Sequence, residues 1–180
     1  APTFIDAVRM VADKTGIALP AVGSPGGGGA PVAPNDASGT ESRKLTDLGN
    51  ATLFRSHHDE GVFYDPSADW RVWDGRRWKL DSDGEVERRA YRTARSLYRE
   101  AAQTADPEQS QAIARWALKS QSRERLNAIV AVARPLMAID PARLDAEPWV
   151  LNVQNGMVDL ATGNLLLHDR KRLCTRLCPV

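Results

Sequence analysis

Several features that define common protein classes are missing from this chain of 180 residues. Its longest apolar runs are only a few residues, far short of the roughly 20 that span a bilayer. No basic start followed by an apolar stretch suggests a secretory signal. The sequence also contains no Gly-Lys-Ser/Thr triplet, so no phosphate-binding loop can be recognised. We therefore expect a cytoplasmic protein with no membrane segment and no nucleotide-triphosphate site in these residues.

Cysteine is scarce as well, and this limits metal chemistry. Cys174 and Cys178 are the only two, and His168 is the only obvious third ligand near them, which leaves a zinc site incomplete. We predict free, reduced thiols and no metal site. His57-His58 comes at the end of an expected helix, where a protonated imidazole would favour the helix dipole. We interpret this pair as a helix end rather than a metal or catalytic site.

What the chain does contain is ordinary globular composition, with 42% hydrophobic and 26% charged residues. It begins with Ala1-Pro2, and we expect it to be a piece of a longer protein. The pattern of residues 1–18 predicts a helix that ends an upstream module. Residues 19–43 are rich in Gly, Pro and Ser, including four consecutive glycines, and predict a flexible linker. Residues 45–178 predict the folded domain.

The pattern of this domain predicts the α+β class, mainly a helical bundle with small β-hairpins near residues 62–80 and 149–168. The expected helices begin at recognisable capping residues, namely Thr46, Asp83, Asp106, and Ser120 or Ser122. Pro135 is expected to end the last helix. The expected inward faces of these helices include Leu48, Tyr98 and Leu118.

The stretch from Asn152 to Gly163 holds a short apolar strand between two glycine-containing turns. Asn155-Gly156 can take the positive backbone angles of a tight turn, and Thr162-Gly163 predicts the next turn. The pattern indicates a β-hairpin and, by itself, no active site.

Basic residues are distributed unevenly, although the formal net charge is only +1. Residues 71–99 hold nine basic side chains against five acidic ones. A second basic cluster lies between positions 115 and 134, where Glu124 is the only acidic residue. It consists of Arg115, Lys119, Arg123, Arg125 and Arg134. Clustered arginine can contact phosphate backbones, and such contact is salt-sensitive. The alternative is an ordinary solvated helix face with internal ion pairs.

The segment from Trp70 to Trp78 combines three tryptophans with three arginines in nine residues. Such a mixture can form a stacking platform for single-stranded nucleic acid. Strand alternation places Trp70 and Val72 on one face, so at least one tryptophan is expected in the core. We therefore favour structural tryptophans and regard the arginines as the better functional candidates.

Three blocks of sequence together resemble a known family. They are Leu45-Thr-Asp-Leu-Gly-Asn-Ala, then Trp73-Asp-Gly-Arg-Arg-Trp78, and, after a helical run, Leu151-Asn-Val-Gln-Asn155-Gly156-Met-Val-Asp159-Leu-Ala-Thr162-Gly163. Over about residues 45–178 the chain resembles the poxvirus-type N-terminal domain of phage and plasmid primase-helicases, which precedes a superfamily 3 helicase. Residues 1–20 more weakly resemble the helix that closes the zinc-binding domain of bacterial-type primases.

The resemblance implies an accessory role in replication of a phage or mobile element within a bacterial host cell. The expected function is noncatalytic DNA binding and coupling, with single-stranded or forked DNA and the downstream helicase as partners. That helicase would bind ATP and Mg²⁺ and assemble as a hexamer, whereas no cofactor is expected in this fragment. The candidate nucleic-acid contacts are Arg76, Arg77, Trp78, Lys79, Arg88, Arg89 and Arg92.

Two alternatives remain at this point. The domain could be a protein-interaction or oligomerisation module that makes no DNA contact and packs between helicase subunits. It could instead be an enzyme such as a nucleotidyl transferase, which needs clustered carboxylates to hold two metal ions. The candidates for such a cluster, Asp81 with Asp83 and Asp140 with Asp145 and Glu147, stand in expected turns with no partner motif.

Overall fold

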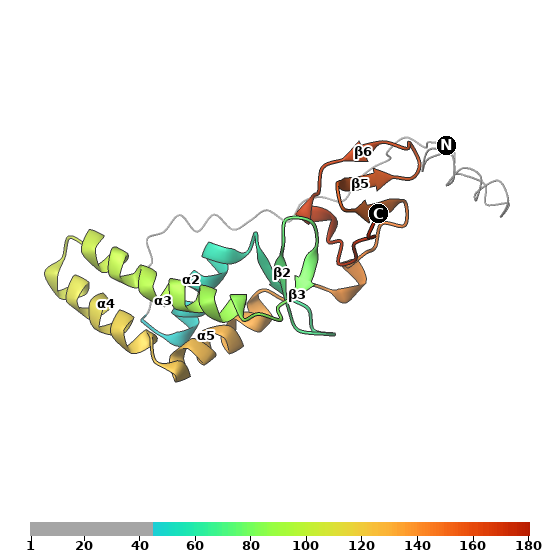
Figure 1. Ribbon diagram of the computed structural model, residues 1–180. Helices are drawn as coiled ribbons and strands as arrows, with labels where there is room; N and C mark the ends of the chain where they lie inside the picture. The colour runs from blue at the N-terminus through green and yellow to red at the C-terminus, as the bar shows by residue number, and fades with distance from the viewer. Residues whose placement is uncertain (1–44) are drawn as a thin grey trace, which may run out of the picture.

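The computed structural model describes residues 45–180, so the expected upstream helix (1–18) and linker (19–43) lie outside the described residues. The described part is α+β, as expected: helices and a first sheet are followed by a second sheet at the opposite end from α4 (Figure 1). The helices are α2 (Asp47–His58), α3 (Glu85–Gln103), α4 (Pro107–Ser120) and α5 (Arg123–Leu136). The strands are β1 (Val62–Tyr64), β2 (Trp70–Trp73), β3 (Trp78–Leu80), β4 (Val150–Val153), β5 (Gly156–Asp159) and β6 (Leu165–Leu166), with short 3-10 helices η1 (Pro141–Arg143) and η2 (Arg170–Arg172).

Both expected hairpin regions form three-stranded antiparallel sheets. The first sheet has the order β1-β2-β3 and the second β4-β5-β6. In the first, Trp73 is paired with Trp78 across the turn that contains Gly75, whose φ of +97° requires glycine. Gly163 likewise has a positive φ, of +75°, after β5. Gly156 does not, so the expectation of positive angles at Asn155-Gly156 is wrong.

Gly156 is required for another reason, which is close packing between β5 and β6. A Cβ atom at this position would run into the carbonyl oxygen of Leu166 and lie 2.9 Å from Cδ1 of Leu165. Any side chain would therefore push β6 away from β5. The glycine of the signature stretch thus sets strand spacing rather than turn geometry.

Helix starts follow the sequence closely, with one exception. The side chains of Thr46, Asp106 and Ser122 each accept a backbone N–H in the first turn of their helices, as predicted. Asp83 does not cap α3, because Gly84 is the N-cap residue and makes no side-chain bond. Instead, the Asp81 carboxylate accepts the N–H groups at the start of α3, both at 2.9 Å.

Pro135 does not end α5. The helix continues to Leu136, and Pro135 stands inside its last turn. The N–H of Met137 still bonds to the carbonyl of Ala133 at 3.0 Å, so the final turn keeps helical geometry on both sides of the proline. Proline removes one donor here, which the last turn of a helix can tolerate more easily than its middle.

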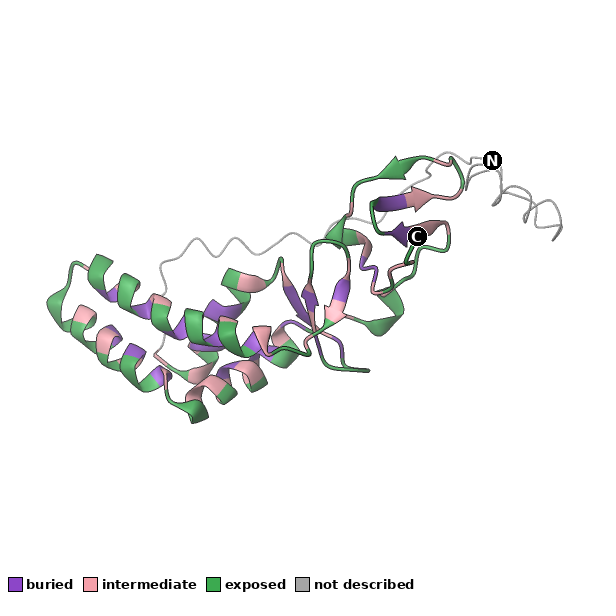
Figure 2. Cartoon of the chain, in the orientation of Figure 1, coloured by how far each residue is buried: buried purple, intermediate pink, exposed green. Residues whose placement is uncertain are grey.

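The main core lies among α2, α3, α5 and the inner face of β2, where Phe54, Trp70 and Ile129 are buried. A second cluster fills the space between α3 and α4, and the outer turns of both helices are exposed (Figure 2). Leu48, Leu118 and Tyr98 were expected to face inward, but all three are exposed. On α2 the polar residue Asn50 is buried together with Ala51, Leu53 and Phe54.

Asn50 is a buried amide with both of its ends satisfied. It donates to the Ser120 hydroxyl at 2.9 Å, and its oxygen accepts from the Trp116 indole at 3.0 Å. These partners lie on α4, so the pair of bonds ties α2 to α4. A buried amide costs little when it is hydrogen-bonded in this way.

The C-terminal segment joins the two sheets. Cys174 accepts the backbone N–H of Trp78 at 2.9 Å, and Leu173 packs in the small core with Trp78. Further along, Cys178 donates its backbone N–H to Asn152 of β4 at 2.8 Å. Residues 173–178 therefore contact the first sheet at one end and the second sheet at the other. No helix among residues 45–180 is long and apolar enough to cross a membrane.

Candidate nucleic-acid interface

Glu85, in the first turn of α3, gathers three of the predicted arginines. Its carboxylate lies 3.0 Å from Nε of Arg88, 2.9 Å from Nε of Arg89 and 3.3 Å from a terminal nitrogen of Arg92. Burial alone would raise the pKa of Glu85, but the hydrogen bonds from Arg89 and Arg88 lower it below its usual value. The carboxylate is thus charged at neutral pH. Three guanidinium groups share this one carboxylate.

Lys79 of β3 joins this group through Asp83. The Lys79 ammonium lies 3.4 Å from the Asp83 carboxylate, and Arg88 lies 3.9 Å from the same carboxylate. The structure therefore brings Lys79, Arg88, Arg89 and Arg92 together at the start of α3, with Asp83 and Glu85 between them. We call these four side chains the basic cluster.

Arg76 and Arg77 lie elsewhere, at the tip of the β2–β3 hairpin. Asp74 accepts the backbone N–H of both residues at 2.8 Å, which fixes the turn. Nε of Arg77 lies 3.7 Å from the Asp74 carboxylate and has no hydrogen-bond partner within residues 45–180. The Arg76 side chain is exposed, and its carbonyl accepts from Asn152. The hairpin tip therefore faces the second sheet and is separate from the basic cluster.

Trp78 cannot stack on a nucleic-acid base. Its side chain is only 3% exposed, and its ring lies 4.6 Å from the ring of Phe63 and 5.5 Å from that of Trp73. Its indole N–H donates to the carbonyl of Arg170 at 2.8 Å. The prediction that placed Trp78 among the nucleic-acid contacts is therefore wrong, whereas the general preference for structural tryptophans agrees with the burial of Trp70 and Trp78.

The His57-His58 pair ends α2, as interpreted, but His58 is not the protonated imidazole expected there. Burial and the nearby Arg89 charge together lower the pKa of His58 from 6.5 to about 4. Its Nε2 lies 3.1 Å from the Thr93 hydroxyl on α3. His58 is therefore neutral at pH 7 and links α2 to α3 as a packed polar side chain.

Part of the second basic cluster is structural. Arg125 lies 2.7 Å from the Asp47 carboxylate and 4.7 Å from the centre of the Trp116 ring, so it ties α5 to α2 and α4. Arg134 lies over the ring of Tyr64 at 5.4 Å. These two guanidinium groups stabilise the fold, which leaves the basic cluster and the rest of α3 as the stronger candidate surface.

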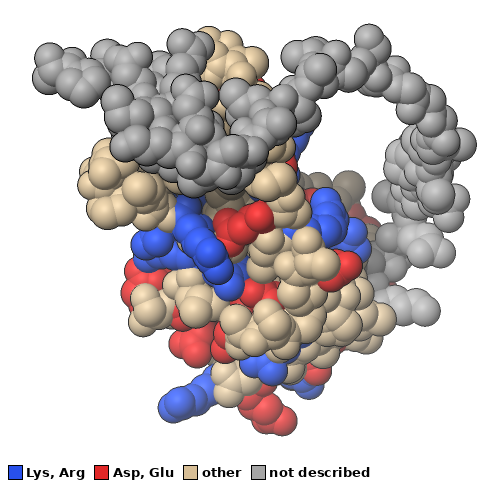
Figure 3. All heavy atoms as spheres, turned by 90° about the vertical axis from the view of Figure 1, so that its right-hand side faces the viewer, with Lys and Arg blue, Asp and Glu red and all other residues tan. Residues whose placement is uncertain are grey.

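Sequence reasoning missed four residues on α3: Arg95, Arg99, Tyr91 and Tyr98. The two tyrosines are 42% and 40% exposed, and Arg95 lies over the Tyr91 ring at 5.8 Å. Helical spacing from Arg88 onward would have found both arginines. On the end face shown in Figure 3, basic and acidic side chains are interspersed, so charge of one sign is not concentrated there.

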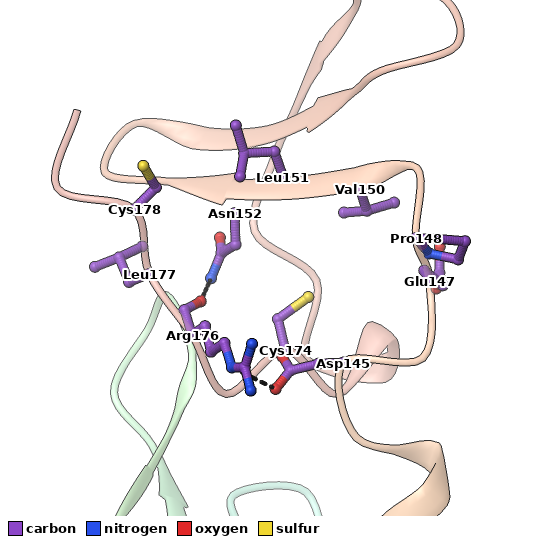
Figure 4. A pocket seen from close by; sticks show the side chains of 10 residues that line it. All are labelled: Asp145, Glu147, Pro148, Val150, Leu151, Asn152, Cys174, Arg176, Leu177 and Cys178. Atoms are coloured by element: carbon purple, nitrogen blue, oxygen red, sulfur yellow. Dashed lines mark hydrogen bonds and ion pairs between the residues drawn. The ribbon is translucent and has the colours of Figure 1, made fainter. Parts of the chain in front are cut away.

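A pocket of about 370 Å³ lies in the C-terminal part, between the residues before β4 and the last segment (Figure 4). Cys174 and Cys178 line it and are both free. Burial and the nearby Asp145 raise the pKa of the Cys174 thiol, so it is protonated and a poor nucleophile. Within residues 45–180 no group of three His, Cys, Asp or Glu side chains is close enough to hold a metal ion.

The carboxylates considered for two-metal chemistry each have a structural partner instead. Asp81 binds the start of α3 and Asp140 accepts the N–H of Ala142 in η1. Asp145 accepts the N–H of Thr175 at 2.7 Å. These side chains hold turns and helix starts in place.

The fold and the arginines of α3 define a class of protein, namely a small α+β domain that carries a basic helix. A family model described as D5 N terminal like matches residues 51–180. This match covers most of the chain, and the protein therefore belongs to the D5 N-terminal-like family. The resemblance seen in the sequence is confirmed at this level. A comparison with curated proteins gives no match.

Proposed function

We propose that this domain is a noncatalytic DNA-binding and coupling domain in a replication protein of the primase-helicase type. Membership of the D5 N-terminal-like family over residues 51–180 supports a place in replication. In such a parent protein, a downstream superfamily 3 helicase would supply ATP and Mg²⁺ binding and hexamer formation. This domain would assist helicase loading or assembly by holding single-stranded or forked DNA.

One observation carries the DNA-binding part: the three arginines that share Glu85. Glu85 alone cannot neutralise three guanidinium groups, and although Asp81, Asp83 and Glu87 add negative charge at the start of α3, the guanidinium groups of Arg88 and Arg92 extend into solvent. Lys79 adds a fourth cation, which Asp83 offsets in part. Arg88 and Arg92 are more than half exposed and can therefore reach a phosphate without a change in fold.

Fluorescence anisotropy with labelled single-stranded and forked DNA tests this function. We expect binding whose affinity falls steeply between about 50 and 200 mM salt, because phosphate contacts release counterions. The variant Arg88→Ala/Arg92→Ala should weaken binding. The control Arg115→Ala/Arg123→Ala removes the same charge from exposed positions on α4 and α5 and should not. Absence of binding at low salt, or an affinity that does not change with salt concentration, would refute the function.

A second candidate function, contact with a neighbouring subunit of the parent protein, is favoured by the outer strand of the second sheet. Within the described residues β6 pairs only with β5, so one edge of its backbone is unpaired. Leu165 and Leu166 are exposed, and Leu167 is 89% exposed. An apolar, unpaired strand edge is a ready site for strand pairing with another protein.

Sedimentation over a range of concentrations tests this second candidate. We expect self-association that the variant Leu165→Lys/Leu167→Lys abolishes, because the charged side chains would oppose strand pairing. The control Leu48→Lys/Leu118→Lys changes two other exposed leucines, on α2 and α4, and should leave association intact. If a longer protein that includes the helicase forms hexamers equally well without residues 45–178, the assembly role is excluded.

A further inference from the structure

The solvent-facing side of α3 carries four arginines in one row. Arg88, Arg92, Arg95 and Arg99 follow one another at intervals of four, three and four residues, which returns a helix to the same face. The opposite face is buried in the core, through residues such as Leu97. At about 1.5 Å per residue the row is about 16 Å long. We call these four residues the arginine row.

The two members of the row farther from Glu85 have the greater freedom to bind phosphate. Arg88 and Arg92 both contact the Glu85 carboxylate. Within residues 45–180, neither Arg95 nor Arg99 forms an ion pair with a carboxylate. A guanidinium group without an internal partner loses no existing ion pair when it binds a phosphate. Arg95 and Arg99 are thus better placed for direct contact than the residues that the sequence pattern indicated.

Two exposed tyrosines flank the arginine row on one side. Tyr91 and Tyr98 are seven residues, or about two turns, apart and so lie on the same side of α3. Neither belongs to a hydrophobic core cluster, so burial does not account for them. The side-chain amide of Gln121 donates to the Tyr98 hydroxyl at 3.0 Å, which holds that ring beside the row. Arg95 in turn lies over the Tyr91 ring.

Aromatic rings beside guanidinium groups are the elements of a single-strand binding surface. Every unpaired base can stack on an exposed ring, whereas bases in a duplex already stack on one another. Phosphate contacts alone would not distinguish the two forms of DNA. The tyrosines therefore point to a single strand, with arginines on its backbone and rings against its bases.

From this arrangement we infer that the arginine row and the two tyrosines form a binding track for single-stranded DNA. Arg95 and Arg99 are the principal phosphate contacts, and Tyr91 and Tyr98 each stack on a base. At about 3.4 Å per nucleotide, the spacing along one strand of a duplex, the row accommodates at most about five nucleotides. This inference rests on the proposed DNA-binding function and specifies its ligand and its site.

Anisotropy titrations of the intact 180-residue protein with a labelled oligothymidine of about 20 nucleotides, and with a duplex of similar length, test the arginines. Arg95→Ala/Arg99→Ala should weaken single-strand binding about tenfold or more at about 0.1 M salt. It should also reduce the slope of log affinity against log salt by about 1.4, since each single-strand phosphate contact contributes about 0.7. The matched control is Arg115→Ala/Arg123→Ala, which should leave both quantities unchanged.

A second variant, Tyr91→Leu/Tyr98→Leu, tests the rings. It should weaken single-strand binding by about fivefold or more, without a change in the salt slope or in duplex affinity. All four substitutions lie at exposed or partly exposed positions, and an unchanged thermal unfolding midpoint shows that each variant is folded.

The possible outcomes separate this inference from the function on which it rests. Salt-dependent DNA binding that survives Arg95→Ala/Arg99→Ala unchanged overturns the track but leaves the proposed function in place. Equal weakening of single-strand and duplex binding by the tyrosine variant overturns the assignment to a single strand. A wild-type protein that binds no DNA at low salt overturns both.

Discussion

Asn152 is expected to be the side chain whose loss most weakens the link between the two sheets. Its amide nitrogen donates to the carbonyls of Arg76 and Arg176, each at 3.0 Å, and its oxygen lies 3.0 Å from Nδ1 of His168. Arg76 is in the β2–β3 hairpin, and Arg176 is in the C-terminal segment, where Figure 4 shows its bond with Asn152. Because two carbonyls receive the NH₂ group, the orientation of this amide is fixed.

The variant Asn152→Ala removes three hydrogen bonds from a buried site. At about 1 kcal/mol each, the loss in the free energy of unfolding should be about 3 kcal/mol. Asn152→Asp should cost still more, because a carboxylate oxygen would then face two carbonyl oxygens and could donate to neither. Urea denaturation followed by tryptophan fluorescence measures these differences, and hydrogen exchange shows whether the loosening is confined to residues 150–178.

Asn155→Ala is the matched control. Asn155 is exposed and three residues away on the same hairpin, and its replacement should change stability by no more than about 0.5 kcal/mol. If Asn152→Ala costs no more than this control, or if Asn152→Asp is as stable as the wild type, the account of Asn152 as the tie between the sheets is refuted.

Three further predictions concern the core and its packing. Gly156→Ala should lower stability in urea by about 1 to 3 kcal/mol, because its Cβ would displace the backbone of Leu166. Asp65→Ala should lower it by about 3 kcal/mol in the same assay, because Arg71, which lies 2.8 Å from that fully buried carboxylate, would lose its charge partner. The unfolding temperature should fall as pH drops from 6.5 toward 4, because His58 is protonated in the unfolded chain over this range but stays neutral in the folded one. The variant His58→Gln should reduce this fall.

The features that the sequence predicted well depend on near neighbours along the chain. The caps at Thr46, Asp106 and Ser122 need only a side chain and an N–H two or three residues away. The convergence of arginines on Glu85 was not predicted, although it too depends only on helical spacing within seven residues. Such local patterns could be read before any fold was known.

Other missed features, unlike the arginines of α3, depend on distant segments. Strand alternation could not show that Trp78 is buried, because the carbonyl that accepts its indole N–H belongs to Arg170, 92 residues further on. Asn50 could be buried in place of an apolar side chain only because Ser120 and Trp116 arrive from α4 to satisfy it. Local sequence carries no information on such partners, and tertiary packing determines whether such a side chain is buried or exposed.

The β2–β3 hairpin connects the binding surface on α3 with the C-terminal sheet. At its base the Asp81 carboxylate holds the start of α3, and at its tip the Arg76 carbonyl receives Asn152. Because these two contacts are at opposite ends of the hairpin, loss of the tip contact leaves the start of α3 intact. Single-strand binding by Asn152→Ala should therefore match that of the wild type, while the amides of residues 150–178 exchange faster. A parallel loss of DNA affinity would show that the sheet itself contributes to the binding site, and the track would then have to extend beyond α3.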